Sequence, residues 1–389
     1  MRYISASIVV PVKGNLIERG VVAVDQTGMI VAVYEEKDPA VSNVKKEFYE
    51  GVLIPGFINA HCHIELSHML GKTPRETGLP RFLINVMKQR ASNEEEILAQ
   101  MEAADKAMYE SGIQAVGDHV NTTLSATVKS KSPMTYHTFV EVMAMTKDDI
   151  QSRVDRARDI EFYFDANHAS ITPHAPYSCL KDLFKAFRKL VHEDNILSIH
   201  NQESDEENRL YRYREGEFLE FYKEMNLNYE SFRAQARNSL QSYLSHLPHN
   251  NTLILVHNTY TSLKDIDFTR RLDRDVYYCM CPKANLYIEG KLPKILQFVP
   301  DNDRMLVGTD SLASNDTLNI LEELKVIVEQ VPELDFLQLI KWATINGAEA
   351  LGLSSTMGSI EVGKRPGLVL IEGMHNLHLT AQATSRRIV

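Results

Sequence analysis

Apolar and polar positions follow two patterns along most of the chain: short apolar runs and longer stretches with helical spacing. From Pro55 onward, short apolar runs alternate with longer stretches in which apolar residues recur at helical spacing. Such alternation is typical of βα units that build a parallel sheet. We predict eight strands, at residues 57–63, 114–119, 136–142, 169–174, 195–200, 252–257, 276–281 and 305–310.

Helix-length segments lie between most of these runs, and two more follow the last one. They cover residues 79–110, 180–192, 218–247, 263–272, 318–330 and 336–351. Eight strands with intervening helices over this length predict an α/β fold, a (β/α)₈ TIM barrel at residues 56–357. The active site of such a barrel lies where the strands have their C-terminal ends.

The two ends of the chain follow a different pattern. Residues 20–33 form two apolar runs around a polar turn, which is typical of a β-hairpin. Residues 367–372 form another apolar run after a turn-rich stretch. Because a few strands alone bury too little surface, we pair the two ends and predict a small β domain of residues 1–55 and 358–389.

Composition and charge argue against some classes of binding partner. The 389 residues carry a formal net charge of −10, which argues against nucleic acid or an anionic membrane as the main partner. No apolar run approaches the roughly 20 residues needed to span a bilayer, and the N-terminus lacks the pattern of a signal peptide. Four cysteines are too few for a disulfide framework, so we expect the chain in the cytoplasm. The expected partner is a small molecule. A homodimer is the expected assembly.

Four residues at predicted strand ends point to a metal site. His61 and His63 are two positions apart at the end of the first barrel strand, so their imidazoles share one face. His200 and Asp310 end two later strands, and the strand ends converge at the barrel mouth. We assign these four as ligands of a divalent metal ion. The fourth strand offers no lysine to bridge a second ion, which points to one metal.

Other polar residues near these strand ends are candidates for proton transfer and substrate contact. Glu203, three residues after His200, suits a proton shuttle, although a glutamate in such a loop is commonly solvated. Asp310 has a second candidate role as acceptor of a proton from water. His257 is either another ligand or a group that polarises the bond under attack, and we favour the second role. His174 either contacts substrate or is a loop histidine bonded to backbone.

Two further features near the predicted mouth have simpler interpretations. The long connection at residues 201–247 is interpreted as a solvated excursion, with a lid over the mouth as the alternative. His119 ends a predicted strand and His68 follows the first motif, and both are assigned structural roles.

The ordered set of motifs resembles the amidohydrolase superfamily, in its cytosine/adenosine-type deaminase and chlorohydrolase branch. Ala284 stands where that branch usually has serine. The similar motifs are PGFxNxHxH at residues 55–63, HxxE at 200–203, the sixth-strand histidine at 256–258, a CPxSN-like turn at 281–285, GTDS at 308–311 and GSIxxGK at 358–364.

This resemblance implies a barrel with a small β-sandwich formed from both chain termini. It also implies one Zn²⁺ ion, with Fe²⁺ as the alternative, on the four ligands already assigned. Glu203 and His257 would then transfer protons and polarise the substrate, and His174 would contact the substrate. Residues 63–68 look most like the aminodeoxyfutalosine deaminase-type subgroup, and Glu65 within them is a second expected substrate contact.

The resulting hypothesis is a metal-dependent hydrolase that acts on non-peptide C–N bonds. We expect a deaminase that releases ammonia from an aminated N-heterocycle, with an adenine-bearing nucleoside related to adenosine, S-adenosylhomocysteine or aminodeoxyfutalosine as the candidate substrate. A chlorohydrolase or cyclic-amide hydrolase with the same site is the alternative. A further alternative is a barrel that has lost catalytic activity. The presence of all four ligands and Glu203 argues against this alternative.

Overall fold

Eight parallel strands form the barrel in the computed structural model, which describes all 389 residues. They belong to two four-stranded sheets that meet at both edges. His200 N donates to His174 O at 3.0 Å across one junction, and Thr309 N donates to His61 O at 3.0 Å across the other. The strands are β6 (Phe57–Cys62), β7 (Ile113–Val120), β8 (Thr135–Val142), β9 (Ala169–Pro173), β10 (Leu197–Asn201), β11 (Leu253–His257), β12 (Val276–Met280) and β13 (Met305–Val307).

Alternation of side chains explains why these segments are strands with two buried faces. On β11, Leu253 and Leu255 pack in the large apolar cluster that includes the surrounding helices. Ile254 and Val256 pack in a second cluster with residues of the other barrel strands. A period of two places alternate residues on opposite faces, so a continuous apolar run fills both the barrel interior and its contact with the helices.

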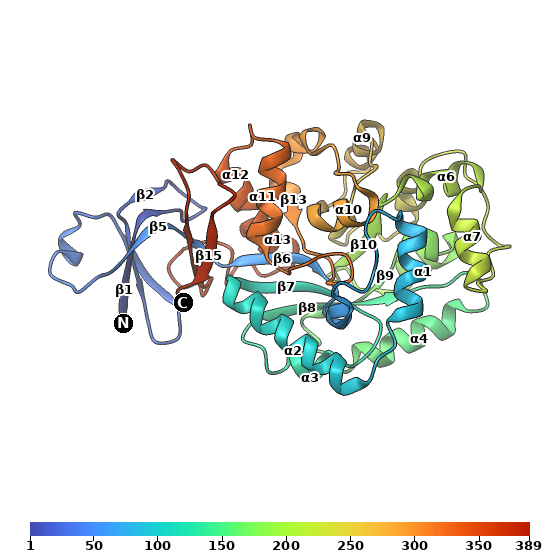
Figure 1. Ribbon diagram of the computed structural model, residues 1–389, viewed down its shortest axis with the longest axis horizontal. Helices are drawn as coiled ribbons and strands as arrows, with labels where there is room; N and C mark the ends of the chain where they lie inside the picture. The colour runs from blue at the N-terminus through green and yellow to red at the C-terminus, as the bar shows by residue number, and fades with distance from the viewer.

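Helices surround the barrel, as Figure 1 shows. The predicted segment 79–110 is two helices, because Asn93 accepts a hydrogen bond from Glu96 N and starts a new helix. The predicted segment 218–247 is helical only at its ends. The helices are α1 (Leu79–Gln89), α2 (Glu94–Ser111), α3 (Ala126–Lys129), α4 (Ile150–Glu161), α5 (Lys181–Leu190), α6 (Asp205–Tyr213), α7 (Glu217–Glu224), α8 (Ser239–Tyr243), α9 (Leu263–Arg271), α10 (Pro282–Glu289), α11 (Ile320–Gln330), α12 (Phe336–Ala343) and α13 (Ile345–Ala350).

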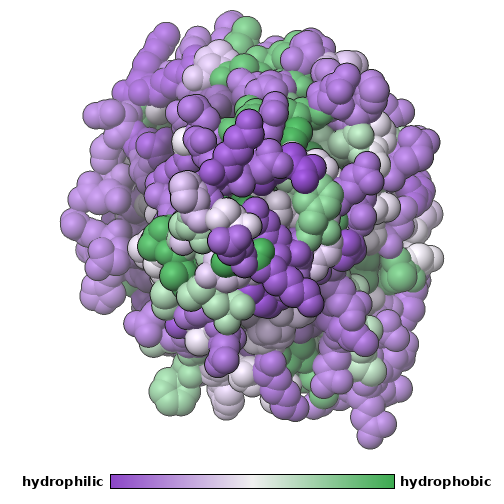
Figure 2. Space-filling view, turned by 90° about the vertical axis from the view of Figure 1, so that its left-hand side faces the viewer, coloured by the Kyte–Doolittle hydropathy of each residue, from purple (hydrophilic) through white to green (hydrophobic).

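Both chain ends contribute to one small sheet beside the barrel (Figure 1). The expected hairpin is the antiparallel pair β3–β4, and the C-terminal β14 pairs antiparallel with β5. Figure 2 views this end, where apolar residues are scattered over a mainly hydrophilic surface. The domain boundaries at 55/56 and 357/358 stay predictions. The strands are β1 (Arg2–Val9), β2 (Ile17–Glu18), β3 (Val21–Val24), β4 (Ile30–Tyr34), β5 (Glu47–Pro55), β14 (Leu368–Glu372) and β15 (Thr384–Arg387).

A buried ion pair supports the loop that leaves β6. Lys129 Nζ lies 2.6 Å from Asp118 Oδ2, and both side chains are almost fully buried. Lys129 also donates to Thr138 Oγ1 at 3.0 Å. The other carboxylate oxygen of Asp118 accepts a hydrogen bond from Ile64 N at 2.8 Å. The pair therefore fixes the backbone directly after His63.

We expect Lys129→Met to lower the free energy of unfolding by about 3–5 kcal/mol, because it leaves the Asp118 carboxylate buried without a partner. Urea denaturation measures the change. The matched control is Lys106→Met, which removes a solvent-exposed pair of Lys106 with Glu110 at 3.8 Å and should cost less than about 1 kcal/mol. Equal effects of the two substitutions would contradict the proposed role of the buried pair.

Candidate functional site

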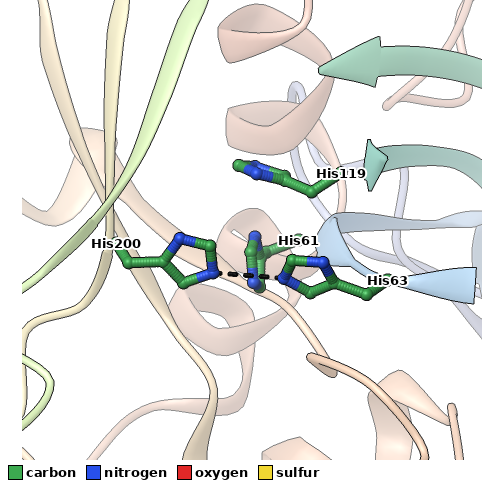
Figure 3. A group of neighbouring side chains, drawn as sticks. All are labelled: His61, His63, His119 and His200. Atoms are coloured by element: carbon green, nitrogen blue, oxygen red, sulfur yellow. Dashed lines mark hydrogen bonds between the residues drawn. The ribbon is translucent and has the colours of Figure 1, made fainter. Parts of the chain in front are cut away.

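The four predicted metal ligands come together at the C-terminal ends of the barrel strands. His63 Nε2 lies 3.1 Å from His200 Nε2. Asp310 Oδ1 lies 3.6 Å from His61 Nε2 and 3.7 Å from His63 Nε2. Figure 3 shows the rings of His63 and His200 directed at each other, with His61 between them. Strands at opposite ends of the sequence thus supply one cluster.

The spacing of these atoms fits a single tetrahedral ion. Bonds of about 2.0–2.2 Å place neighbouring ligand atoms of a tetrahedral site roughly 3.3–3.6 Å apart. The three separations given above, which run from 3.1 to 3.7 Å, are close to that range. Moreover, His61 Nε2 is buried without a hydrogen-bond partner, a costly state for a polar atom. A divalent cation in this space would satisfy it, so the residues fit the metal.

The protonation states of the imidazoles also suit a metal ion. His200 lies with its Nδ1 2.8 Å from His174 O. A carbonyl only accepts, so Nδ1 carries the proton and Nε2 presents a lone pair. Burial lowers the pKa of His63 to about 4 and that of His61 well below its ordinary value. These rings are therefore neutral at neutral pH, as metal ligands must be.

Asp310 is held as an ionised carboxylate. Ser314 Oγ donates to Asp310 Oδ2 at 2.6 Å, which leaves Oδ1 directed at the histidines. Burial opposes ionisation, but His257 and His63 together with this hydrogen bond hold the pKa of Asp310 below its usual value. Its φ of 56° lies in the left-handed region that non-glycine residues rarely adopt. Such strain is typical of functional sites, and His257 shares it with a φ of 72°.

Glu203 and His257 face each other beside this cluster. Asn285 Oδ1 lies 3.0 Å from His257 Nδ1, and His257 Nε2 lies 3.6 Å from Glu203 Oε1. Glu203 is buried, so its interpretation as a solvated loop residue is wrong. Burial and the nearby Asp310 charge raise the pKa of Glu203 well above its ordinary value. Its carboxyl group is therefore suited to hold and donate a proton.

Two residues that were not predicted as site residues join the cluster. The ring of His119 lies 4.5 Å from that of His61 and above the other rings in Figure 3. His119 Nδ1 is 3.0 Å from Glu141 Oε1 and its Nε2 is 2.8 Å from Ser198 Oγ, so the protein satisfies both ring nitrogens. Glu141 also lines the cavity described below. Its place near the end of the predicted strand 136–142 is the signal that could have identified it.

The two expected substrate contacts differ in position. His174 lines the cavity, and its Nδ1 lies 2.7 Å from Ser178 Oγ. Glu65 does not line the cavity. Its carboxylate accepts hydrogen bonds from Asn121 N at 2.9 Å and Thr122 N at 3.1 Å. The structure therefore does not bring Glu65 together with the other candidate residues, because backbone N–H groups of the next loop occupy its oxygens.

A cavity of about 550 Å³ opens above the cluster, a size suited to small organic ligands. Its lining includes His63, His200, Glu203, His257 and Asp310. Residues of α1 and of the segment around α7 form much of its wall, and Figure 1 shows these helices at the end of the barrel remote from the small sheet. The connection at residues 201–247 thus contributes to the wall of the site, which agrees with the alternative of a lid rather than with the favoured solvated excursion.

The chain belongs to the amidohydrolase family, whose model matches residues 52–388. An adenosine deaminase of Helicobacter pylori is 26% identical over 365 residues, covering 92% of this chain and 88% of that protein. The crystal structure of Helicobacter pylori aminofutalosine deaminase in complex with methylthio-coformycin has a TM-score of 0.83 at 25% identity, covering 96% and 93% of the two chains. A zinc-complexed atrazine chlorohydrolase of Arthrobacter aurescens has a TM-score of 0.75 at 17% identity, covering 97% and 90%.

These similarities confirm the predicted family and the barrel fold. They also support the predicted hydrolase of the deaminase type that acts on C–N bonds of a small molecule. None of the helices combines the length and the apolar character needed to cross a membrane.

We expect His61→Asn to lower zinc affinity by at least about 100-fold, more than the loss of an outer-shell partner costs. Zinc content after dialysis against a chelator, measured by mass spectrometry, tests this. The matched control is His137→Asn, since His137 is equally a buried barrel histidine but bonds Ser170 Oγ at 3.1 Å and belongs to no ligand cluster. If His137→Asn loses as much zinc as His61→Asn, the assignment of the ligands is wrong.

Proposed function

We propose that this chain catalyses the hydrolytic deamination of an adenine-bearing nucleoside, with release of ammonia. One observation carries the proposal: the proton-holding Glu203 and the ionised Asp310 face the same cavity as the cluster of metal ligands. Acid–base catalysis of such a reaction requires one protonated and one ionised carboxyl group. The deaminase names of the relatives support this choice, whereas the likeness to the chlorohydrolase concerns the fold alone.

The ligand set suits zinc, which favours imidazole and carboxylate donors in a tetrahedral arrangement. When bound at His61, His63, His200 and Asp310, the ion supplies hydroxide near neutral pH by lowering the pKa of water. Zinc as the resident ion is part of the proposal. The cytoplasm is the proposed location, because all four cysteines are buried free thiols. The homodimer stays a prediction.

The residues divide the proton transfers among them. Asp310, held at Oδ2 by Ser314, accepts a proton from the attacking water and passes it to the amino group. Glu203 donates its proton to the ring nitrogen beside the amino-bearing carbon. When the C–N bond breaks and ammonia leaves, the proton of the added hydroxyl group returns to Glu203 and the carbonyl forms. His257, held at Nδ1 by Asn285, directs Nε2 into the cavity and stabilises the charge that develops on the attacking oxygen. In the free protein this Nε2 is a buried atom without a hydrogen-bond partner, ready for such a contact.

Replacing the proposed acid tests the mechanism. We expect Glu203→Gln to lower kcat by about 10²–10⁴-fold, because the amide cannot deliver a proton, while zinc content is unchanged. Ammonia release from a panel of adenine nucleosides measures the rate. The matched control is Glu206→Gln, because Glu206 lies on the same segment but is bonded to Arg209 at the surface. A near-normal rate for the Glu203 variant would remove this residue from the mechanism.

Other residues of the cavity lining support a narrower proposal about the nucleoside. Phe82 and Val86 of α1 and Phe221 of α7 make its wall apolar. Arg90 and Arg153 also line it together with Asp149, and neither arginine forms an ion pair. An unpaired arginine in a cavity favours an anionic ligand group. We therefore propose a nucleoside whose 5′ substituent has an apolar part and a terminal carboxylate.

Matched substrates test this specificity. We expect a 5′-thioadenosine that ends in a carboxylate to have a higher kcat/KM than its methyl ester. The double variant Arg90→Gln, Arg153→Gln should lower this preference about 10–100-fold, because it loses charge-assisted hydrogen bonds to the carboxylate. Arg156→Gln is the control, because Arg156 lies on the same helix as Arg153 but outside the cavity lining. An unaltered preference in the double variant would show that the arginines do not read the substituent.

A further inference from the structure

Glu141 is a buried carboxylate enclosed by histidines. It lies on β8 and is only 7% exposed. Its Oε1 is 3.0 Å from His119 Nδ1, 3.7 Å from His200 Nδ1 and 4.0 Å from His174 Nε2. Its Oε2 accepts a hydrogen bond from Asn121 Nδ2 at 2.7 Å. None of the reaction roles assigned above uses this carboxylate.

The bonds of Glu141 fix the orientation of His119. A carboxylate with two accepted hydrogen bonds only accepts, so His119 Nδ1 must carry a proton and donate it. The Nε2 of His119 then accepts from the Ser198 hydroxyl. The ring held in this way lies 4.5 Å from the ring of His61 and 5.3 Å from those of His63 and His200. It forms one wall against the three ligand imidazoles.

The charge of Glu141 has no fixed cation beside it. Both of its carboxylate oxygens accept hydrogen bonds, one from His119 Nδ1 and one from Asn121 Nδ2, as those of an ionised carboxylate do. Every ion-pair partner of Glu141 within 4 Å is a histidine, with no lysine or arginine. Buried charges are normally paired with a charge or with a metal. The cation that this carboxylate requires is therefore the ion expected at the adjacent ligand cluster.

We propose that Glu141 is a positioning residue of the metal centre: it orients His119 against the ligand imidazoles and supplies a negative charge that raises metal affinity. It does not touch the reacting atoms in this account. The inference shares the metal ligands with the proposed function, but its test measures metal binding without substrate. A failure of the deamination proposal and a failure of this one are therefore distinguishable.

The test compares zinc affinity in Glu141→Gln and in a matched control. Competition with a chromophoric chelator should show a dissociation constant about 10–100-fold higher for Glu141→Gln, the usual effect of losing an outer-shell partner of a metal site. Glu65→Gln is the control, because Glu65 is a similarly buried carboxylate that bonds backbone N–H groups of the same loop but no histidine. Its zinc affinity should equal that of the unaltered protein.

Glu141→Asp separates charge from simple packing. It keeps the negative charge, so we expect it to retain more zinc affinity than Glu141→Gln. Thermal unfolding of the metal-free proteins provides the second readout, which measures a loss of packing separately from a loss of metal affinity. Normal zinc affinity in Glu141→Gln would overturn the proposal. Equal losses of affinity and of metal-free stability in both Glu141 variants would also overturn it and would show a merely structural role.

Discussion

A single electrostatic constraint governs the barrel mouth: three neutral imidazoles and an ionised Asp310 are buried around one small space. Each of these groups is unfavourable there without a cation, because a buried lone pair or charge must find a partner. Strands from both ends of the barrel supply the groups, so barrel closure is required for the site to exist. The hydrogen bond from Thr309 N to His61 O makes this closure at the site itself. Left-handed backbone at His257 and Asp310 is tolerated where this arrangement demands it.

The same burial separates the roles of two carboxyl groups. Glu203 has no cationic neighbour and faces the charge of Asp310, so burial keeps it protonated. Asp310 is surrounded by imidazoles and a donating serine, so it stays ionised. One environment thereby provides both an acid and a base near neutral pH, which is the general pattern of acid–base catalysis with paired carboxyl groups. The deaminase relatives and the cavity of about 550 Å³ then indicate a nucleoside rather than a small ion or a polymer.

Local patterns in the sequence were sufficient to predict the barrel and the convergence of most candidate residues at its mouth. The two-residue spacing of His61 and His63 predicts a shared face, and the position of His200 and Asp310 at strand ends predicts their convergence. Glu141 was not found: its place near the end of a predicted strand is the one local signal, and that signal does not reveal the histidines that surround it. Glu65 was expected at the substrate, but its oxygens bond Asn121 and Thr122, whose loop conformation no spacing rule provides. Glu207, four residues after Glu203, is likewise fully buried and accepts a hydrogen bond from Gln202 N.

The most direct test of this account is ammonia release from 5′-substituted adenosines by zinc-loaded protein before and after removal of the metal. The account predicts one ammonia for each hypoxanthine nucleoside formed, loss of the reaction when a chelator removes zinc, and recovery when zinc returns. A full rate in the metal-free protein, or release of another group without ammonia, would contradict it.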